Sequence, residues 1–289
     1  MPKPTPQEIR QHRDYLRRQE RYEQRYVGDF YKYLELVYAT AATTIEKAGP
    51  DAYLSQIGLR QHETTLRNIY VSLYSDISLD EARLEYDLVA SPEKRSGGPQ
   101  GTKDIIDDLA GQIPFTQGGV VKLWRELLRE YLEVRIATRI QQVTETTVKH
   151  ITQVIQQGLS KGDGPLVIAR ALRKFTGFNR NRSIAIARTE TVTAGNQGKY
   201  LAAQSSDLVL EKRWIPTLDG KTRHSHREFI DSEYIPLEAV FVVSKRSGGS
   251  ETARYPGDES LSAENVVNCR CGIGFRPVRN ADGSLRYKL

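Results

Sequence analysis

The chain has 289 residues, of which 38% are hydrophobic and 27% are charged, and its formal net charge is +6. It contains no apolar run of about 18 residues, so we expect no membrane span, and its charged N-terminus is unlike a secretory signal. Basic side chains are concentrated in residues 161–289, which hold 21 lysines and arginines against 14 acidic residues. This imbalance favours contact with a polyanion such as DNA, although it is a weak signal by itself.

A long helix is predicted over residues 6–47. Thr5 and Glu8 have the spacing of a capping box, and Gly49-Pro50 ends the helical pattern. The first half of this helix is charged on nearly every face, with arginines at positions 10, 13, 17, 18, 21 and 25. We interpret this half either as a solvated helix or as an arm that docks on another protein or on nucleic acid.

Two further helices are predicted over residues 56–74 and 78–89, the second opened by a capping box at Ser78-Leu-Asp-Glu81. Residues 91–119 hold six glycines and three prolines, which predicts a flexible connection. Within it, residues 96–103 resemble a phosphate loop but lack its Gly-Lys-Ser/Thr ending, so we interpret them as an ordinary loop.

The apolar residues of residues 120–157 recur every three or four positions, which predicts a long helix. Shorter helices are expected over residues 166–175, ended by Thr176-Gly177, and 181–204. The apolar period then changes to two, which predicts strands near 208–216, 239–243 and 269–276. The sequence therefore predicts an α+β protein. It has an all-α region of long helices (1–160, for docking and assembly), a small domain with a short antiparallel sheet (161–280) and a tail (281–289).

Rare, reactive residues are concentrated between positions 187 and 274, where both cysteines occur. Cys269 and Cys271 are two positions apart, a separation that rarely suits an unstrained disulfide. Two thiolates and two imidazoles are ligands that suit tetrahedral zinc, and they are offered here by His224, His226, Cys269 and Cys271. One hypothesis is a structural zinc ion, with Asp219 as an alternative ligand to His224. The other is that the cysteines are small buried hydrophobes and that His226 hydrogen-bonds Asp219 or the backbone of Asn268.

Five short motifs of this stretch follow one another in the order Ala187-Arg-Thr-Glu-Thr191, Trp214, Asp219 with Arg223 and His226, Tyr255-Pro-Gly-Asp258, and Asn268-Cys-Arg-Cys271. In this order the chain resembles, over residues 160–276, the head-morphogenesis family of tailed bacteriophages typified by the minor head protein F of phage Mu. The positions that match the family pattern are Arg188, Thr189, Glu190, Trp214, Asp219, Arg223, His226, Asn268, Cys269, Arg270 and Cys271. His224 is an additional histidine beside this pattern.

The resemblance implies a minor capsid protein that acts in prohead assembly, with the portal protein and the prohead shell or scaffold as partners. Its expected location is the phage head interior or portal vertex in the virion, and the host cytoplasm during assembly. A sequence-independent contact with packaged DNA is also expected. The resemblance implies no enzymatic activity and no established cofactor. Some members carry an added ADP-ribosyltransferase domain after the shared region, and we expect none here because thirteen residues follow Arg276.

Two alternatives remain open for a protein associated with the phage head. In a metal-dependent nuclease, His226 would act as general base, Asp219 or Glu190 would bind the metal, and Arg223 or Arg270 would clamp the phosphate. These residues do not have the spacing of a known catalytic motif. In a non-specific DNA-binding protein, affinity would fall steeply with salt, and the chain shows no recognition-helix or zinc-finger pattern.

Overall fold

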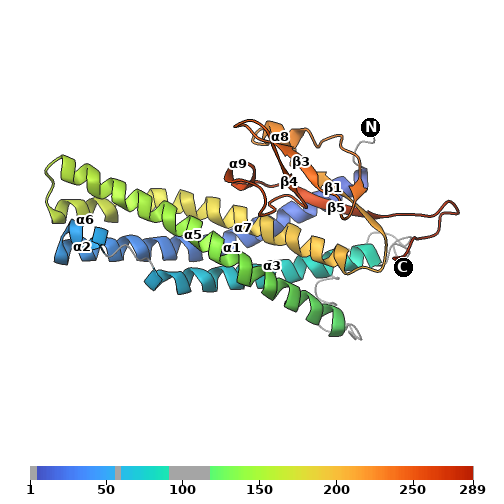
Figure 1. Ribbon diagram of the computed structural model, residues 1–289, viewed down its shortest axis with the longest axis horizontal. Coiled ribbons are helices and arrows are strands. Elements are labelled where there is room, and N and C mark those ends of the chain that lie inside the picture. The colour runs from blue at the N-terminus through green and yellow to red at the C-terminus, as the bar shows by residue number, and fades with distance from the viewer. Residues whose placement is uncertain (1–4, 56–59, 91–117, 289) are drawn as a thin grey trace.

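The computed structural model describes residues 5–55, 60–90 and 118–288 (Figure 1). The helices are α1 (Pro6–Ala48), α2 (Pro50–Ser55), α3 (Arg60–Ala90), α5 (Gly118–Ser160), α6 (Pro165–Arg173), α7 (Thr176–Gln204), α8 (His224–Arg227) and α9 (Ala263–Val266). The strands are β1 (Leu210–Ile215), β2 (Ile235–Pro236), β3 (Phe241–Ser244), β4 (Ser250–Ala253) and β5 (Gly272–Pro277). Long helices followed by short strands confirm the predicted α+β class.

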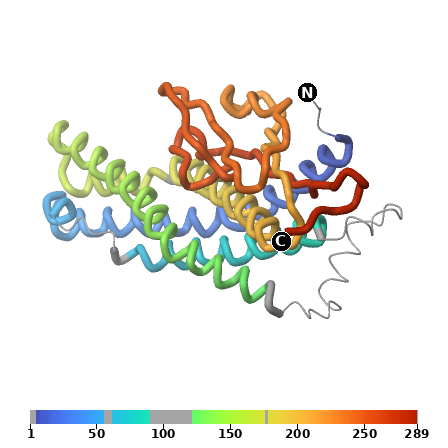
Figure 2. The backbone as a smooth tube through the Cα atoms, turned by 45° about the vertical axis from the view of Figure 1, so that its right-hand side comes forward, coloured from blue at the N-terminus to red at the C-terminus, as the bar shows by residue number. Residues whose placement is uncertain are grey.

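The four long helices α1, α3, α5 and α7 lie along the long axis of the molecule, and the strands cover one side near one end (Figures 1 and 2). The predicted helices over residues 6–47 and 120–157 are confirmed by α1 and α5. No helix in the described part of the chain is both long enough and apolar enough to cross a bilayer. The predicted flexible connection and the stretch that resembles a phosphate loop lie outside the described residues, except for Gly118 and Gly119 at the start of α5.

Helix α1 begins as its sequence predicts, because the backbone N–H of Glu8 donates to Thr5 Oγ1 at 3.2 Å while Glu8 accepts from the backbone N–H of Thr5 at 2.6 Å. Its charged first half is neither fully solvated nor a free arm. Tyr15, Gln19 and Tyr26 are buried on one side of this half. The helix packs against α3 and α7 there, so the prediction of a helix solvated on every side was wrong, while docking by its exposed side stays a prediction.

Helix α3 runs without interruption through residues 78–81, so the predicted capping box there was wrong. Ser78 is fully buried and its hydroxyl donates to the carbonyl of Ala194 in α7 at 2.9 Å. Glu81 accepts two hydrogen bonds from Arg18 at 2.8 and 2.9 Å. Both polar side chains therefore bind neighbouring helices instead of capping their own. Thr176 likewise opens α7, where the sequence pattern predicted a helix end.

The sheet that carries the site has the strand order β2-β1-β5, all antiparallel, and β3 and β4 form a separate hairpin. In the β1–β5 register, Trp214 is opposite Ile273. The strands predicted near 208–216, 239–243 and 269–276 correspond to β1, β3 and β5, whereas the short strands β2 and β4 were not predicted. Strand β1 does not alternate strictly, since Lys212 and Arg213 are both buried.

Two large apolar clusters stabilise the molecule. One lies between the long helices and α6, and the other lies beneath the strands. Helix α7 contributes to both, with Ala187 and Ala194 in the first and Tyr200 and Ala203 in the second. A shared helix of this kind fixes the sheet on the bundle. The domain boundary predicted at residue 160 is not tested by this packing and stays a prediction.

Candidate functional site

His226, Cys269 and Cys271 meet in the interior beneath the sheet. One ligand atom from each lies within 4.8 Å of the others. The Nδ1 atom of His226 lies 3.4 Å from the sulfur of Cys271 and 3.7 Å from that of Cys269. All three side chains are buried, with exposed fractions of 1 to 2%. Both cysteines are free thiols, so this cluster is a pair of thiols facing one imidazole.

The loop before β5 gives the two thiols their direction. Asn268 has a left-handed backbone with φ of 59°, a conformation that asparagine tolerates better than most residues. The backbone N–H of Cys271 then donates to the sulfur of Cys269 at 3.4 Å. The pKa of the Cys271 thiol is held well below its usual value because Cys269 donates a hydrogen bond to it, and His226 adds to this effect. The pKa of the Cys269 thiol is raised because it is the donor of that hydrogen bond and is buried.

Aromatic side chains enclose the imidazole. Trp214 of β1 stacks on Phe229 with ring centroids 4.8 Å apart, and the His226 ring stands edge-on to Trp214 at 5.2 Å. The Nε2 atom of His226 is buried and has no hydrogen-bond partner among the described residues. The imidazole therefore makes its polar contacts through Nδ1, on the side of the sulfurs.

The two other proposed ligands lie elsewhere. The side chain of His224 is 95% exposed and pairs with Glu228 at 3.4 Å. Asp219 forms an ion pair of 2.6 Å with Arg270 and accepts from the backbone N–H of Lys221 at 2.9 Å. Neither residue belongs to the cluster of three, and His226 does not hydrogen-bond Asp219 as the second hypothesis supposed.

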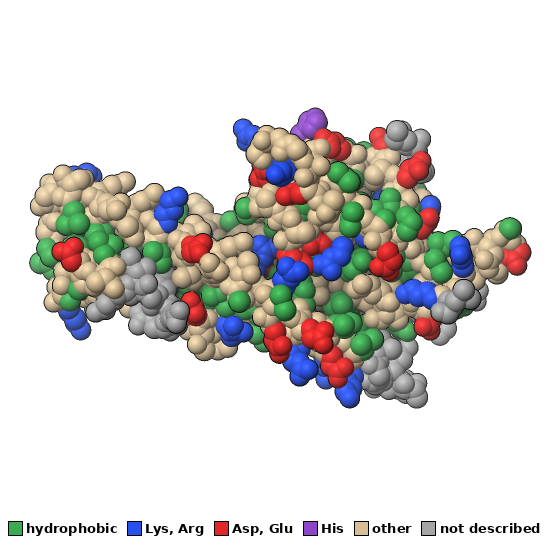
Figure 3. Space-filling model, viewed as in Figure 1, with side chains coloured by type: hydrophobic (Ala, Val, Ile, Leu, Met, Phe, Trp, Pro, Cys, Tyr) green, Lys and Arg blue, Asp and Glu red, His purple; other side chains and the backbone are tan. Residues whose placement is uncertain are grey.

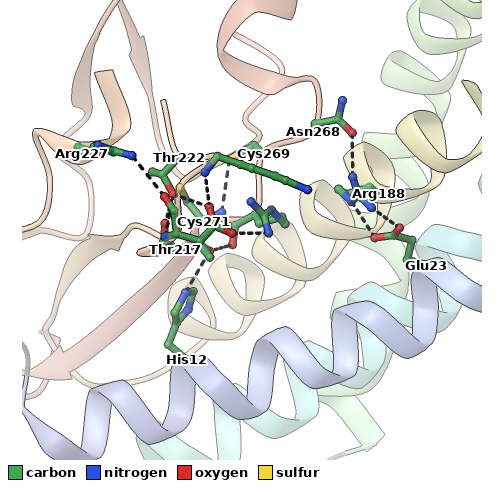
Figure 4. A network of polar contacts seen from close by, with 12 residues as sticks. His12, Glu23, Arg188, Thr217, Thr222, Arg227, Asn268, Cys269 and Cys271 are labelled. Atoms are coloured by element: carbon green, nitrogen blue, oxygen red, sulfur yellow. Dashed lines mark hydrogen bonds and ion pairs between the residues drawn. The ribbon is translucent and has the colours of Figure 1, made fainter. Parts of the chain in front are cut away.

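A polar cleft of about 610 Å³ adjoins the cluster, between α1, α7 and the loops before α8 and β5 (Figure 4). Its charged and amide side chains come from Gln19, Glu20, Glu23, Arg188, Lys221, Arg223, Asn268 and Arg270. Arg188 donates two hydrogen bonds to Glu23 at 2.8 and 3.0 Å and reaches Asn268 at 3.4 Å. Arg223 donates to the carbonyl of Val267. Four residues of the predicted motif thus line one cleft.

Thr189 and Glu190 serve other contacts. The hydroxyl of Thr189 accepts from the backbone N–H of Asn268 at 3.0 Å, so it holds the cysteine loop on α7. Glu190 points into the helical bundle, where Tyr74 donates to it at 2.8 Å and Arg139 lies 3.9 Å away. The sequence motif therefore divides between the cleft and the bundle.

The order of these motifs is matched by comparison with known families. A family model described as phage Mu protein F like protein matches residues 149–273, from within α5 to within β5. The match covers less than half of the chain, and it shows that residues 149–273 are similar to this family. The expected resemblance is thereby confirmed for this part of the chain, which we call the Mu F like region.

Two curated proteins are similar to this chain. The NAD(+)–arginine ADP-ribosyltransferase EFV of Enterococcus faecalis is 28% identical over 140 residues, which are 47% of this chain and 27% of that protein. The uncharacterized protein YqbB of Bacillus subtilis is 26% identical over 174 residues, which are 58% of this chain and 52% of that protein. The matches thus span about a quarter and about half of these relatives' lengths. No solved structure matches the chain.

Sequence reasoning missed a residue that joins α7 to the loop after β4 and to β5. Asn196 of α7 is buried, and its amide donates to the carbonyls of Pro256 and Cys271, each at 2.9 Å. Its oxygen accepts from the backbone N–H of Ile273 at 3.1 Å. The available signal was an asparagine next to Ala194, Gly195 and Gly198 in α7, and such small residues also fit ordinary packing.

His12 of α1 is a second residue that the sequence did not single out. Its surroundings predict that the folded protein loses stability in acid. His12 lies under the Mu F like region, with Nε2 3.4 Å from the hydroxyl of Thr217. Burial, and secondarily the charge of Lys199, lowers its pKa from 6.5 to about 4. Between these values the unfolded chain binds the proton more readily, so stability is lost as the pH falls from 6.5 toward 4.

We expect a His12→Gln variant to lack this pH-dependent loss of stability. On going from pH 7 to pH 4, the unfolding free energy of the wild type should fall by about 1–3 kcal/mol more than that of the variant. Urea unfolding at a series of pH values measures it. A difference that stays constant over this range would show that His12 titrates normally.

Proposed function

We propose that the protein is a minor capsid protein of a tailed bacteriophage that acts in prohead assembly at the portal vertex. The observation that carries this proposal is the Mu F like region at residues 149–273. The bundle that holds this region supplies long helical faces beyond its own core, with α1 and α5 of 43 residues each. Such faces suit docking on the portal protein, and the proposed role implies that the protein is a component of the virion.

The surface we assign to docking is an arginine stripe on α1, made of Arg10, Arg13, Arg17 and Arg21. These residues are spaced by three or four positions, so they share one side of the helix, and all four are exposed. Arg17 is paired with Asp14 at 3.4 Å, and the other three make no ion pair with a described residue. The opposite side of the same helix is buried in the core.

Charge reversal tests the stripe better than truncation, because deleting α1 would remove part of the core. In a variant with R10E, R13E, R17E and R21E, we expect co-purification with the portal protein of the same phage to fall by about tenfold or more. The matched control reverses four exposed cations near the other end of the bundle, Lys161, Arg170, Lys174 and Arg180. It should keep the complex.

The outcomes distinguish a failure of the portal role from a failure of the arginine stripe as the docking surface. If wild type forms no complex with the portal protein, the portal role is wrong. If both variants bind as wild type does, docking uses another face. Circular dichroism of both variants establishes that any loss is not caused by unfolding, since exposed substitutions usually change stability by less than about 0.5 kcal/mol.

DNA is a second candidate partner for the same stripe, favoured by its four exposed guanidinium groups. On the face shown in Figure 3, by contrast, cationic side chains are interspersed with anionic ones. Binding of the wild-type chain and both variants to duplex DNA at two salt concentrations distinguishes this candidate. Sequence-independent binding that weakens with salt and is lost only in the stripe variant would assign DNA to the stripe.

The geometry gives less support to a nuclease. His226, its proposed general base, is 1% exposed and faces two sulfurs, whereas a general base must reach the proton it abstracts. The carboxylate of Asp219 is paired with Arg270. The similarity to an ADP-ribosyltransferase covers 27% of that protein, so its named activity is not carried over to this chain.

A further inference from the structure

We propose that His226, Cys269 and Cys271 bind one zinc ion, which fixes the cysteine loop of the Mu F like region. Nothing in the family description or in the names of the relatives assigns such a site. The proposal rests on the convergence of these three side chains in the interior. It is independent of the portal role proposed above.

The spacing of the three ligand atoms fits a tetrahedral metal. With Zn–S near 2.3 Å and Zn–N near 2.05 Å, tetrahedral angles place nitrogen and sulfur about 3.5 Å apart. The two observed separations from His226 Nδ1, 3.4 and 3.7 Å, lie on either side of this value. Both nitrogen–sulfur separations therefore suit an ion shared by His226 and the two cysteines, and the two sulfurs lie within 4.8 Å of each other.

The chemistry of the ligands also favours zinc. Two thiolates and one imidazole are soft and borderline ligands that select zinc over magnesium or calcium. Two thiolates would neutralise the ion's double positive charge, so the buried complex would carry no net charge. The backbone N–H of Cys271 donates to the sulfur of Cys269, and such outer contacts orient metal-binding thiolates.

Simple burial explains the cluster less well. Two small hydrophobic cysteines need no imidazole nitrogen aimed between them, and a buried polar atom is costly unless it has a partner. Here Nδ1 faces both sulfurs, at 3.4 and 3.7 Å. No fourth His, Cys, Asp or Glu of the described residues joins the cluster. We assign the fourth position to a water molecule.

A bound ion would organise the neighbouring cleft. Cys269 and Cys271 flank Arg270, whose side chain pairs with Asp219 at 2.6 Å and whose carbonyl accepts from Thr217 at 2.6 Å. Asn268, directly before them, contacts Arg188 and Thr189. Fixing both cysteines on one ion therefore fixes the loop that carries these cleft residues.

The test is the metal content of the full chain, expressed with zinc and purified without chelators. We expect about one equivalent of zinc in wild type, and less than about a tenth in His226→Ala and Cys271→Ser. The matched control is His224→Ala, which removes an exposed histidine two positions away. It should retain the full equivalent.

Cobalt substitution of the wild-type chain keeps the proposal testable if the ligand variants fail to fold. Tetrahedral cobalt bound by two thiolates gives intense visible bands and a sulfur-to-cobalt charge-transfer band, which an adventitious surface ion lacks. Wild-type protein that holds less than about a tenth of an equivalent of zinc and shows no such bands would overturn the proposal. So would equal loss of zinc in the His224→Ala control.

Discussion

Replacing Gly198 by alanine is expected to lower the free energy of unfolding by about 3 kcal/mol or more. Gly198 lies where α7 crosses α3, and a Cβ built on it would lie 2.1 Å from the carbonyl oxygen of Ser78 and 2.7 Å from its Cα. Both are backbone atoms, so no side chain can rotate away. The added methyl group must separate the two helices.

Two other helical glycines supply a graded control for this substitution, measured by urea unfolding. A Cβ at Gly28 meets nothing within 4 Å, so Gly28→Ala should stabilise the protein by about 0.5–1 kcal/mol through helix propensity. A Cβ at Gly195 meets the end of the Gln19 side chain at 2.5 Å, which can move, so an intermediate loss is expected. A Gly198→Ala variant as stable as wild type would mean that α3 and α7 are not closely packed at this crossing.

The same crossing shows why the sequence predicted the long helices but not all of their limits. Residues 6–47 and 120–157 have apolar periods and end signals that act locally, and α1 and α5 match them. The break expected at Ser78 depended on a local cap, but Ser78 donates to Ala194 instead. That contact joins residues 116 positions apart, and no local pattern contains it.

The candidate site was predictable in its composition and not in its geometry. Two cysteines and a nearby histidine pair are visible in the sequence, but their spacing could not decide between His224 and His226. The short helix α8 decides it, because His226 turns inward against Trp214 while His224 faces solvent. Glu23 and Asn196 were not predictable, since their contacts with Arg188 and β5 arise only when α1, α7 and the sheet assemble.

Glu190→Ala is the second substitution with a large expected effect, a loss of about 3–5 kcal/mol in unfolding free energy. The Glu190 carboxylate is 5% exposed and joins α7 to α3 through Tyr74 and to α5 through Arg139, whose side chain is 16% exposed. The Glu190 carboxylate also raises the pKa of Arg139 above its usual value. Alanine would leave a cation buried without its counter-charge and a tyrosine hydroxyl without its acceptor.

A matched exposed pair and a double variant separate this cause from simple loss of volume. Asp14, paired with Arg17 at the surface, is 43% exposed, so Asp14→Ala should cost less than about 0.5 kcal/mol. If an unpaired charge dominates, Glu190→Met should be less stable than the double variant Glu190→Met with Arg139→Met, because the second change removes the stranded cation. Chemical unfolding of these variants measures the coupling. If the losses from the two single substitutions simply add, Glu190 stabilises the bundle through packing and not through its charge.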